Sequence, residues 1–405
     1  MLLGATLGFL LQVFAPQAVT DYLCKNLFSS VTDMFMNAIK MIVTPLVFFS
    51  IASSVAGFGD IRSLGKTGLK VLSCYLFTAL IAILVGLGVF RLFQPGDPAL
   101  LSAMNNSAES YTQSASAAST SVRAFVVGII PSNIINAFAA PDMLQVIFLA
   151  VIIGIGSSKM GEASAKIRDT LDTCNDLFSA IASMIIRFLP VSAFCSMANM
   201  TSKTGLKTMA KLLPWLGSVY AGCLLMLVVY SLILLFVRRR PSIFFKKFGA
   251  VMLTAYSVGS TNVALPVSMD VCGKKLGISR KIYSFSLPFG TTINMDGGCL
   301  LQVISVLFLA KIFGVSIQGG QLLSLLLTVM VLSLGAPSVS GSCLVCVAML
   351  LPPVGIPMEA ISLLIGLYPL AGSMLTVGNC TGDAVITTAI ATMEKQIDEN
   401  IFNAP

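Results

Sequence analysis

Asn294-Met295-Asp296-Gly297-Gly298 places a carboxylate within apolar sequence, and Asn379-Cys380-Thr381-Gly382-Asp383 does so again further along the chain. A carboxylate at the centre of a bilayer costs roughly 3 kcal/mol or more, so it is seldom found there without a partner. The chain has no histidine, and neither string has a lysine or arginine within helical reach. A bound cation is therefore the partner that the sequence predicts.

The composition indicates an all-α polytopic membrane protein. Of the 405 residues, 56% are hydrophobic and only 10% are charged, whereas soluble domains carry about 25% charged residues. Uncharged runs at residues 41–59, 71–90 and 212–237 are long enough, or nearly so, to cross a hydrocarbon layer of ~30 Å. A large, apolar but soluble α-protein is the alternative that this composition disfavours.

The formal charge of +8 does not indicate a nucleic-acid partner, because most basic residues lie in loops between the apolar runs. Basic clusters occupy residues 62–70, 159–168, 238–247 and 274–281. The positive-inside rule places these loops in the cytoplasm and residues 94–121, which lack Lys and Arg, outside. Lys203, Lys207 and Lys211 oppose this assignment, since alternation of the spans puts them outside. We expect a multi-pass protein of the inner (plasma) membrane with a cytoplasmic C-terminus.

The ten cysteines are scattered through apolar sequence, so we expect packing residues rather than a disulfide framework. Cys343-Leu344-Val345-Cys346 matches C-x-x-C, but no second pair and no histidine accompany it. The ligand spacing of a zinc site is therefore missing. The N-terminus lacks the basic region and cleavage site of a signal peptide and is expected to be a first helix.

The chain changes character after residue 240. Before it, helices are expected at residues 2–15, 32–58, 69–95, 121–158, 171–200 and 208–238. After it, one unit occurs twice: an apolar hairpin with a polar break, then a helix with an Asn and an Asp in its middle. The hairpins are expected at 243–273 and 321–354, and the helices at 281–313 and 358–394.

The breaks in the two hairpins favour a transporter. Non-helical backbone at membrane depth is tolerated only where protein buries it or where it lines a wet cavity. Paired broken segments are typical of an inverted-repeat transporter with its site at the midplane. Two kinked structural helices are the alternative, but Gly and Pro alone would suffice for those. Residues 257–262 and 335–342 add several Ser, Thr and Asn side chains.

The residue types suit a hard cation, which prefers oxygen ligands. Asn379 and Asp383 are four apart and so share one helix face. Asn294 and Asp296 can share a cation-facing surface only where the helix is unwound, and Gly297-Gly298 makes unwinding cheap. The hairpin tips are expected to offer backbone N–H groups to an anionic group of a substrate.

Along essentially its whole length the chain resembles the dicarboxylate/amino acid:cation symporters, the glutamate-transporter-like family. The matching strings are Tyr283–Gly290, Thr292–Gly297, Leu144–Ile147, Leu265-Pro266 and Asn379–Asp383. The resemblance implies eight transmembrane helices plus two re-entrant helical hairpins with inverted repeats, an elevator-type transporter and a homotrimer. It also implies that the protein is not an enzyme and has no catalytic residues.

In that fold a scaffold of the first, second, fourth and fifth helices would hold a mobile transport unit. The implied segments are 1–68 (scaffold helices 1 and 2), 69–95 (helix 3), 96–205 (external loop and scaffold helices 4 and 5), 206–240 (helix 6), 241–314 (hairpin 1 and helix 7), 315–395 (hairpin 2 and helix 8) and 396–405 (C-terminal tail).

The resemblance further implies sodium as the transported coupling ion, at three sites. The first would use the Gly290 carbonyl, Asn294, Asn379 and Asp383. The second would use Tyr75, Thr78, Asn294 and Asp296. The third would use backbone groups of Thr292, Ser333, Leu334 and Ala336, near the thioether of Met295. Ala79 stands where relatives often have a Ser hydroxyl, which leaves the second site one ligand fewer.

The positions implied for the substrate depart from the family's pattern. They are Ser260, Thr261, Asn262, Gly298, Ala336, Ser338, Val339, Ser340, Gly341, Gly372, Leu375, Thr376 and Asn379. Acidic-substrate members carry an Asp where Gly372 stands and an Arg where Leu375 stands; Gly259 replaces an Arg that some prokaryotic members have before the first hairpin's serines. Tyr368, one turn before Gly372, is expected to fill part of the vacated volume.

These departures bear on the cargo. A second substrate carboxylate would be buried without a cationic partner, at a cost of several kcal/mol. A small neutral amino acid is therefore the leading expectation. The alternative is a sodium-coupled symporter of a dicarboxylate, an acidic amino acid or another small carboxylate.

Two other classes of protein, a channel and a membrane enzyme, fit these residues less well. A channel would need a continuous polar face on several helices, whereas the polar residues here concentrate in two hairpins and two helices. A membrane enzyme would need a nucleophile with its base or a metal centre, and the lack of histidine removes the commonest base.

Overall fold

The computed structural model describes residues 2–63, 65–98, 100, 130–139, 143–161, 163–204, 210–334 and 341–404. These residues are helical apart from turns, connecting segments and one isolated bridge between Ile278 and Ile397. The predicted all-α class is confirmed for this part of the chain. Part of the predicted helix at 121–158 and the tip of the second hairpin lie outside the described residues.

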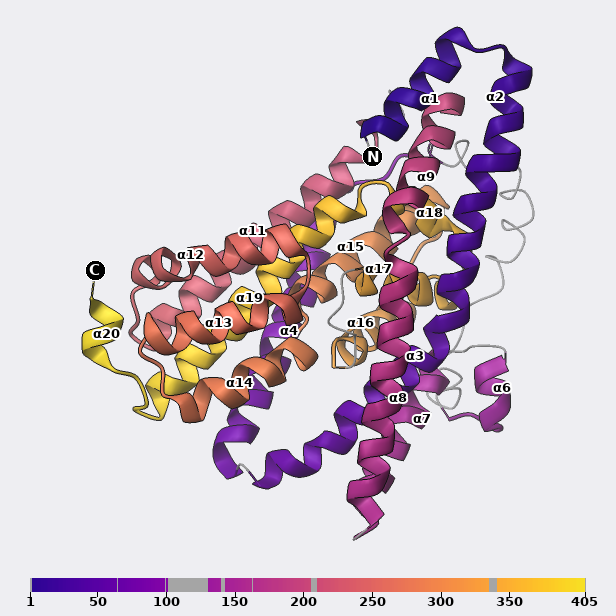
Figure 1. Cartoon of the computed structure of the whole chain (residues 1–405). Helices are drawn as coiled ribbons and strands as arrows, with labels where there is room; N and C mark the ends of the chain where they lie inside the picture. The colour runs from indigo at the N-terminus through magenta and orange to yellow at the C-terminus, as the bar shows by residue number, and fades with distance from the viewer. Residues whose placement is uncertain are drawn as a thin grey trace.

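The helices form two parts that lie side by side (Figure 1). The first part, here called the long-helix layer, consists of α1 (Leu2–Phe14), α2 (Gln17–Leu23), α3 (Ser29–Ser63), α6 (Ile134–Ala139), α7 (Met143–Ser158), α8 (Ala163–Ile186) and α9 (Leu189–Thr204). In it α3 packs against α7, α8 and α9, and α1 packs against α9. A π-helical turn joins α2 to α3, so the predicted helix at 32–58 is part of a longer one.

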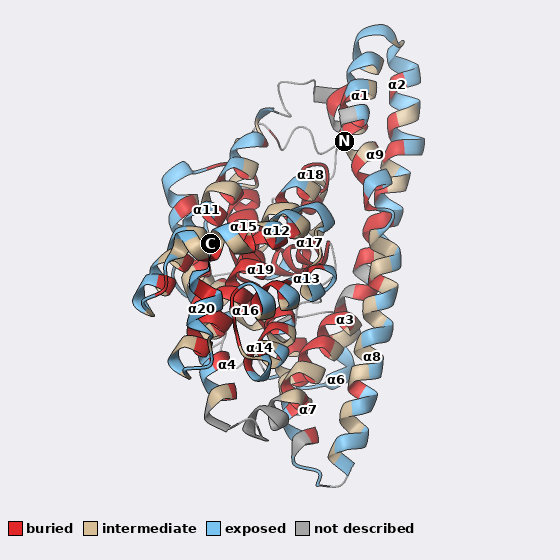
Figure 2. Cartoon of the chain, turned by 60° about the vertical axis from the view of Figure 1, so that its left-hand side comes forward, coloured by how far each residue is buried: buried red, intermediate tan, exposed pale blue. Residues whose placement is uncertain are grey.

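The second part, here called the compact bundle, contains the remaining helices. They are α4 (Gly65–Phe93), α11 (Leu213–Phe236), α12 (Pro241–Val258), α13 (Thr261–Lys274), α14 (Arg280–Ile293), α15 (Asp296–Ile312), α16 (Gly319–Ser333), α17 (Ser342–Leu350), α18 (Ser362–Ile365), α19 (Tyr368–Met393) and α20 (Glu399–Asn403). At its centre, α15 and α19 are almost entirely buried (Figure 2). The two helices that carry the isolated carboxylates are thus enclosed by the rest of the bundle.

The first hairpin is broken where the sequence predicts. Gly259 ends α12 in the left-handed region at a φ of +64°, Ser260 is extended, and α13 starts at Thr261. Glycine adopts this left-handed conformation without the steric cost that a Cβ imposes. The small residues at the tip therefore let the chain reverse direction inside the bundle.

The long helix predicted at 281–313 is unwound at Asn294 and Met295, which have φ/ψ of −99°/85° and −106°/52°. The predicted reason for unwinding is only partly right, because Gly297 and Gly298 lie within the first turn of α15. Gly297 serves close packing instead: a Cβ there would lie 2.5 Å from the carbonyl oxygen of Leu375. At this position the glycine lets α15 approach α19.

Two helices predicted as continuous are bent. The chain turns by 88° between Met358–Ile365 and Tyr368–Met393, and by 41° between Ala163–Ile186 and Leu189–Asn199. Pro369 lies in the first turn of α19 and Pro190 in the first turn of α9. Proline is tolerated in a first helical turn but cannot continue a preceding helix without a kink.

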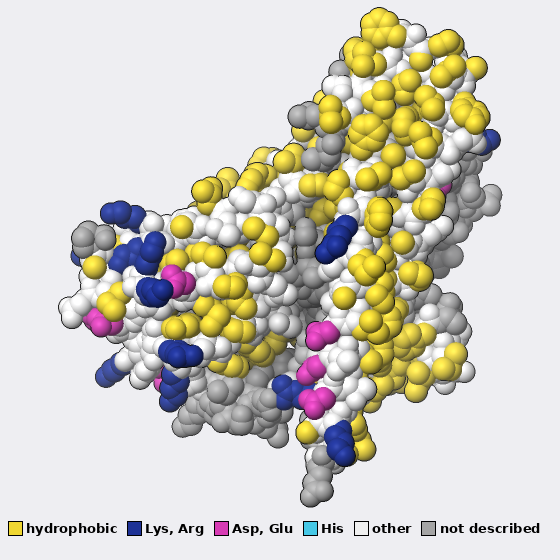
Figure 3. Space-filling model, in the orientation of Figure 1, with side chains coloured by type: hydrophobic (Ala, Val, Ile, Leu, Met, Phe, Trp, Pro, Cys, Tyr) yellow, Lys and Arg dark blue, Asp and Glu magenta, His cyan; other side chains and the backbone are white. Residues whose placement is uncertain are grey.

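Four helical stretches of the described residues are long and apolar enough to cross a membrane, or up to six if each bent pair is one span. This supports a polytopic membrane protein, while the expected count of eight remains a prediction. Figure 3 shows basic side chains gathered at the end of the compact bundle near the C-terminus, and apolar side chains along the long helices.

Candidate cation and substrate site

The two isolated carboxylates meet in the core of the compact bundle. Asp296 starts α15 and Asp383 lies in the middle of α19, and their relative exposures are 0% and 2%. Asn294 links the two strings, because its Nδ2 donates a hydrogen bond to Asp383 Oδ1 over 3.0 Å. The hydroxyl of Tyr230, on α11, donates to Asp296 Oδ2 over 2.6 Å.

Among the described residues, each carboxylate keeps one oxygen without a hydrogen-bond partner. These atoms are Asp296 Oδ1 and Asp383 Oδ2, and both are buried. Among the residues that the structure describes, no ion pair joins either carboxylate to a basic side chain. Buried charges are normally paired or coordinate a metal ion. The donor set of two carboxylates, an amide and hydroxyls therefore fits a hard cation.

Tyr75 and Thr78 of α4 border the same cluster. Thr78 Oγ1 donates to Asn294 Oδ1 over 3.1 Å. The hydroxyl of Tyr75 donates to the carbonyl oxygen of Ser286 over 2.9 Å, and Ser286 Oγ lies 2.8 Å from Thr387 Oγ1. The residues predicted for the second cation site thus lie near one another in the core of the bundle. Hydroxyl groups of Ser286 on α14 and Thr387 on α19 lie beside them.

Two glycines leave the space that the cluster needs. A Cβ at Gly290 would lie 2.5 Å from Asp383 Oδ1 and 2.6 Å from the hydroxyl oxygen of Tyr75. A Cβ at Gly382 would lie 2.7 Å from the hydroxyl oxygen of Tyr230 and 3.0 Å from Asp296 Oδ2. The sequence predicts no role for Gly382. No pattern in the sequence near Tyr230 predicts that this residue contacts Asp296.

Asn379 faces the other way from the carboxylate pair. Its Oδ1 accepts a hydrogen bond from Gly297 N over 2.8 Å, and its Nδ2 lies 3.3 Å from the sulfur of Met295. Both polar atoms of the Asn379 side chain are thereby hydrogen-bonded to Gly297 and Met295. Asn379 was also expected to be a ligand of the first cation site. Thr292 was expected to contribute a backbone group to the third cation site. Its side chain is exposed, and its hydroxyl donates to the carbonyl oxygen of Pro288 in the same helix.

The third predicted cation site lies partly outside the described residues. Ser333 is buried and its Oγ donates to the Met330 carbonyl over 2.7 Å, while Leu334 ends α16. Their predicted companion Ala336 lies outside the described residues, as do Ser338, Val339 and Ser340. The third site and these four substrate contacts remain predictions.

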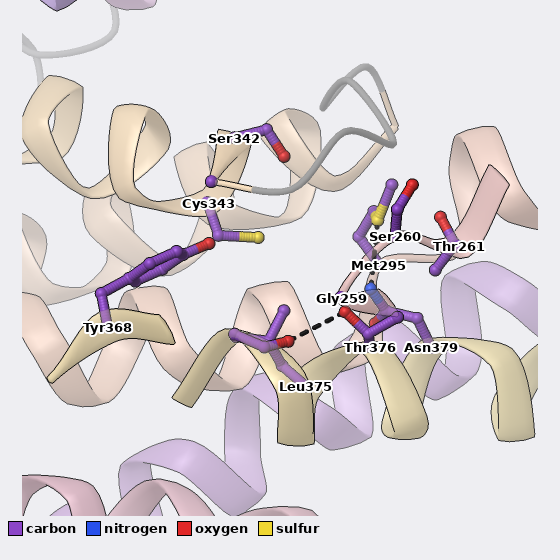
Figure 4. A pocket seen from close by; sticks show the side chains of 12 residues that line it. Gly259, Ser260, Thr261, Met295, Ser342, Cys343, Tyr368, Leu375, Thr376 and Asn379 are labelled. Carbon is purple, nitrogen blue, oxygen red and sulfur yellow. Dashed lines mark hydrogen bonds between the residues drawn. The ribbon is translucent and has the colours of Figure 1, made fainter. Parts of the chain in front are cut away.

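A cavity lies where the two hairpins meet (Figure 4). Its volume is about 20 Å³, which is room for about one water molecule, so a larger ligand requires the hairpins to move apart. Its lining comes from both hairpins, the unwound segment and α19: Gly259, Ser260, Thr261, Met295, Gly341, Ser342, Cys343, Tyr368, Gly372, Leu375, Thr376 and Asn379. None of these described lining residues is charged. The N-termini of α13 and α17 both lie at this cavity.

Most of the described substrate positions line this cavity, but two do not. Asn262 is exposed on α13, one residue past the lining. Gly298 lies behind the cavity wall that Cys343 forms, since a Cβ at Gly298 would be 3.1 Å from the sulfur of Cys343. The side chain of Tyr368 extends toward Cys343 (Figure 4), and a Cβ at Gly372 would lie 3.3 Å from its ring. Tyr368 thus fills part of the space beside Gly372, as expected.

These features are typical of secondary transporters: two broken hairpins in a helical membrane protein, a buried carboxylate cluster and an uncharged cavity beside it. The sequence profile of the sodium:dicarboxylate symporter family matches residues 1–393, and the chain belongs to that family. The resemblance drawn from the motifs is thereby confirmed. A multi-pass membrane protein that transports a small molecule agrees with both findings.

Similar proteins cover most of the chain. A C4-dicarboxylate transport protein of Bacillus subtilis (strain 168) is 30% identical over 91% of this chain and 87% of its own length. A proton/sodium-glutamate symport protein of Bacillus caldotenax is 30% identical over 91% of this chain and 88% of its own. The proton/glutamate-aspartate symporter of Escherichia coli (strain K12) is 29% identical over 98% and 92%.

These names bear on the two cargo hypotheses. Each relative is described as carrying an acid with two carboxyl groups, and none of the three is described as carrying a neutral amino acid. The comparisons therefore favour the alternative hypothesis over the leading one. The names also pair sodium or protons with transport, which supports cation coupling without choosing the ion.

Proposed function

We propose that this chain is a sodium-coupled symporter of a short dicarboxylate or another small carboxylate. The observation that carries the proposal is the pair of unpartnered oxygens, Asp296 Oδ1 and Asp383 Oδ2, in a buried cluster without a basic side chain among the described residues. Two negative charges at close range in a medium of low dielectric constant repel strongly. A cation between the strings removes that repulsion and supplies the missing partner.

Sodium suits the cluster better than a proton alone. A proton would neutralise one carboxylate, whereas the site also presents the amide oxygen of Asn294 and the hydroxyl of Thr78. Several oxygens converging on one place are the ligands that hard cations prefer. Protons remain the second candidate because relatives are named as proton symporters.

The substrate would bind in the cavity between the hairpins. The N-terminal ends of α13 and α17 face it, and helix N-termini favour anions through free N–H groups and the helix dipole. One carboxylate of the substrate would lie there. The bound cation and the substrate would then be separated only by the unwound segment at Met295 and by Asn379.

Movement of the compact bundle against the long-helix layer would carry both ligands across the membrane. The two parts would correspond to the transport unit and the scaffold that the family resemblance implies, in a homotrimer. The basic side chains near the C-terminus support a cytoplasmic position for that end, by the positive-inside rule.

Uptake of labelled succinate into proteoliposomes tests the proposal. We expect uptake driven by an inward sodium gradient, and Asp383→Asn should abolish it because the cluster loses a charged ligand. Sodium at a hundredfold excess over its dissociation constant should raise the stability of the wild type by about 2.7 kcal/mol, and that of the variant by almost nothing.

The matched control is Asp270→Asn, on the exposed side of α13, where Asp270 pairs with Lys274 at 2.5 Å. It removes a carboxylate of the same type and should keep both sodium responses. Sodium-dependent stabilisation that survives in Asp383→Asn would remove Asp383 from the cation site. Uptake that follows a proton gradient and ignores sodium would replace the coupling ion.

A further inference from the structure

Gln302 is a buried amide whose polar atoms have no hydrogen-bond partner in the described part of the chain. It lies on α15, one and a half turns beyond Asp296, with a relative exposure of 0%. Neither its Oε1 nor its Nε2 has a hydrogen-bond partner among the residues that the structure describes. A buried polar group left unsatisfied costs about 1–3 kcal/mol, so such groups call for an explanation. A ligand that is bound only during transport would supply one.

The amide does not itself line the cavity between the hairpins, but it lies close to two residues that do. A Cβ at Gly298 would be 3.9 Å from Gln302 Nε2, 3.1 Å from the sulfur of Cys343 and 3.4 Å from Cβ of Met295. Cys343 and Met295 both line the cavity. Because residue 298 has no side chain, it puts nothing between the amide and that wall of the cavity.

The chemistry of this wall selects against a charged group. No described lining residue carries a charge, so a carboxylate here would be buried without a counter-charge, which is strongly unfavourable. A protonated carboxyl group is uncharged and offers one O–H donor and one carbonyl acceptor. An amide offers the complementary pair, an acceptor Oε1 and a donor Nε2.

We propose that Gln302 binds the second carboxyl group of a short dicarboxylic acid in its protonated form, through two hydrogen bonds. This inference rests on the proposed function. The first carboxylate lies at the hairpin helix ends, and the acid enters as a monoanion. Its own proton then crosses the membrane with it, in addition to the sodium ion. Recognition of a second carboxyl group needs no arginine under this arrangement.

The titratable neighbours leave the proton with the substrate. The helices packed around α15, and α15 itself, carry the following titratable or charged residues: Asp296, Cys299 and Lys311 of α15, Cys343 and Cys346 of α17, Tyr368, Cys380 and Asp383 of α19, Tyr220, Cys223 and Tyr230 of α11, and Lys66, Lys70, Cys74, Tyr75 and Arg91 of α4; α16 has none. Lys66, Lys70 and Arg91 lie in the end turns of α4 and Lys311 lies in the last turn of α15, all away from Gln302 along the chain. Thiols and phenols are uncharged near neutral pH. The two aspartates are engaged in the cation cluster.

The experiment compares succinate with butyrate, which lacks the second carboxyl group, in proteoliposomes at saturating sodium and over a range of pH. For the wild type the apparent KM for total succinate should rise about tenfold per pH unit above the second pKa of the acid. The KM for butyrate should stay level over the same range. Gln302→Met keeps the side-chain length but removes both hydrogen-bonding atoms. It should lower the affinity for succinate relative to butyrate by about tenfold at acidic pH.

Two further variants make the result interpretable. Gln318→Met alters an exposed glutamine at the start of α16 and should keep the wild-type pH dependence. Gly298→Ala places a methyl group 3.9 Å from Gln302 Nε2 and should reproduce the loss of Gln302→Met if that variant does not fold. Sodium-dependent stabilisation reports folding in each case.

A succinate KM that does not change with pH, or a Gln302→Met protein with the wild-type ratio of affinities, would overturn the inference and leave the symporter intact. A wild type that takes up neither acid under a sodium or proton gradient would overturn the proposed function itself.

Discussion

At the scale of single residues, the absence of a side chain matters as much as its presence. Gly290 and Gly382 come from different helices and each faces a carboxylate of the cluster. Larger residues there would displace the oxygen atoms that a cation needs. The sequence pointed to Gly290 as a carbonyl ligand through the family resemblance, while its close approach to Asp383 and Tyr75 is a property of the folded bundle.

Gly290→Ala should destroy cation binding without unfolding the bundle. The added Cβ would lie 2.5 Å from Asp383 Oδ1, so the carboxylate has to shift, and overpacking of this kind costs about 1–3 kcal/mol. We expect the sodium-dependent rise in melting temperature to disappear.

Gly88→Ala is the matched control for Gly290→Ala, because no described residue outside the adjacent backbone of α4 comes within 4 Å of a Cβ placed at this position. It should leave the sodium response unchanged and raise stability by up to about 1 kcal/mol through helix propensity. A Gly290→Ala protein with a normal sodium response would show that the cation lies elsewhere.

At the scale of elements, the C-terminal segment is docked on the bundle. Arg239, in the short connection between α11 and α12, makes two hydrogen bonds of 2.6 Å to the carboxylate of Glu399 on α20 and lies 4.9 Å above the ring of Phe402. Lys247 Nζ donates to the carbonyl oxygens of Ile401 and Phe402 over 2.7 and 3.0 Å. Residues 396–405 were expected only to form a tail, and nothing local in the sequence pairs them with α11 and α12.

Acid should weaken this docking in a predictable direction. Hydrogen bonds from Arg239 lower the pKa of Glu399, so the contact stabilises the folded protein above the pKa of an unfolded Glu, about 4.3. That stabilisation is lost as the pH falls through the lowered pKa. Because the Glu399 side chain is 61% exposed, its contribution should stay below about 1 kcal/mol.

Thermal unfolding of Glu399→Gln and the wild type in detergent checks this. The difference in melting temperature should be greatest near neutral pH and should vanish in strong acid. In an Arg239→Ala background, Glu399→Gln should have almost no further effect. An equal difference at both pH values would mean that the ion pair is not its cause.

At the scale of the whole molecule, the described helices of the two parts meet mainly where α3 packs on α4 and α17, α7 on α16, and α9 on α18. Short α18 packs on α9, and Ser196 Oγ of the long-helix layer donates to the carbonyl oxygen of Ser362 in the compact bundle over 3.0 Å. Inside the long-helix layer, the hydroxyl of Ser53 on α3 donates a hydrogen bond to Asp172 Oδ1 on α8. Contacts between the parts must break if the bundle moves, whereas contacts within a part can persist.

A disulfide between the parts should therefore stop transport. We expect Ser196→Cys with Ser362→Cys, after oxidation, to block succinate uptake and to release it on reduction. Cys74 and Cys174, the described cysteines that are not buried, are replaced by Ser first. Ser53→Cys with Asp172→Cys is the control and should transport in both states. Full uptake by the oxidised Ser196–Ser362 pair would exclude movement at this contact.

Sequence reasoning predicted the membrane class, the first hairpin and the strings that hold Asp296 and Asp383. It could do so because the cost of placing a charge in apolar surroundings depends on residue type and on neighbours along the chain. It did not predict the bends at α8–α9 and α18–α19, since a proline in a first turn is compatible with either a kink or a new helix.

The tertiary structure decided which polar atoms remain without partners. Tyr230 reaches Asp296 from another helix, and the isolation of Gln302 follows from the packing of several helices around α15. Such pairings join residues far apart in the chain, so no local pattern records them. Hydropathy and isolated charges belong to the one-dimensional chain, whereas a vacant ligand position exists only after the helices have packed.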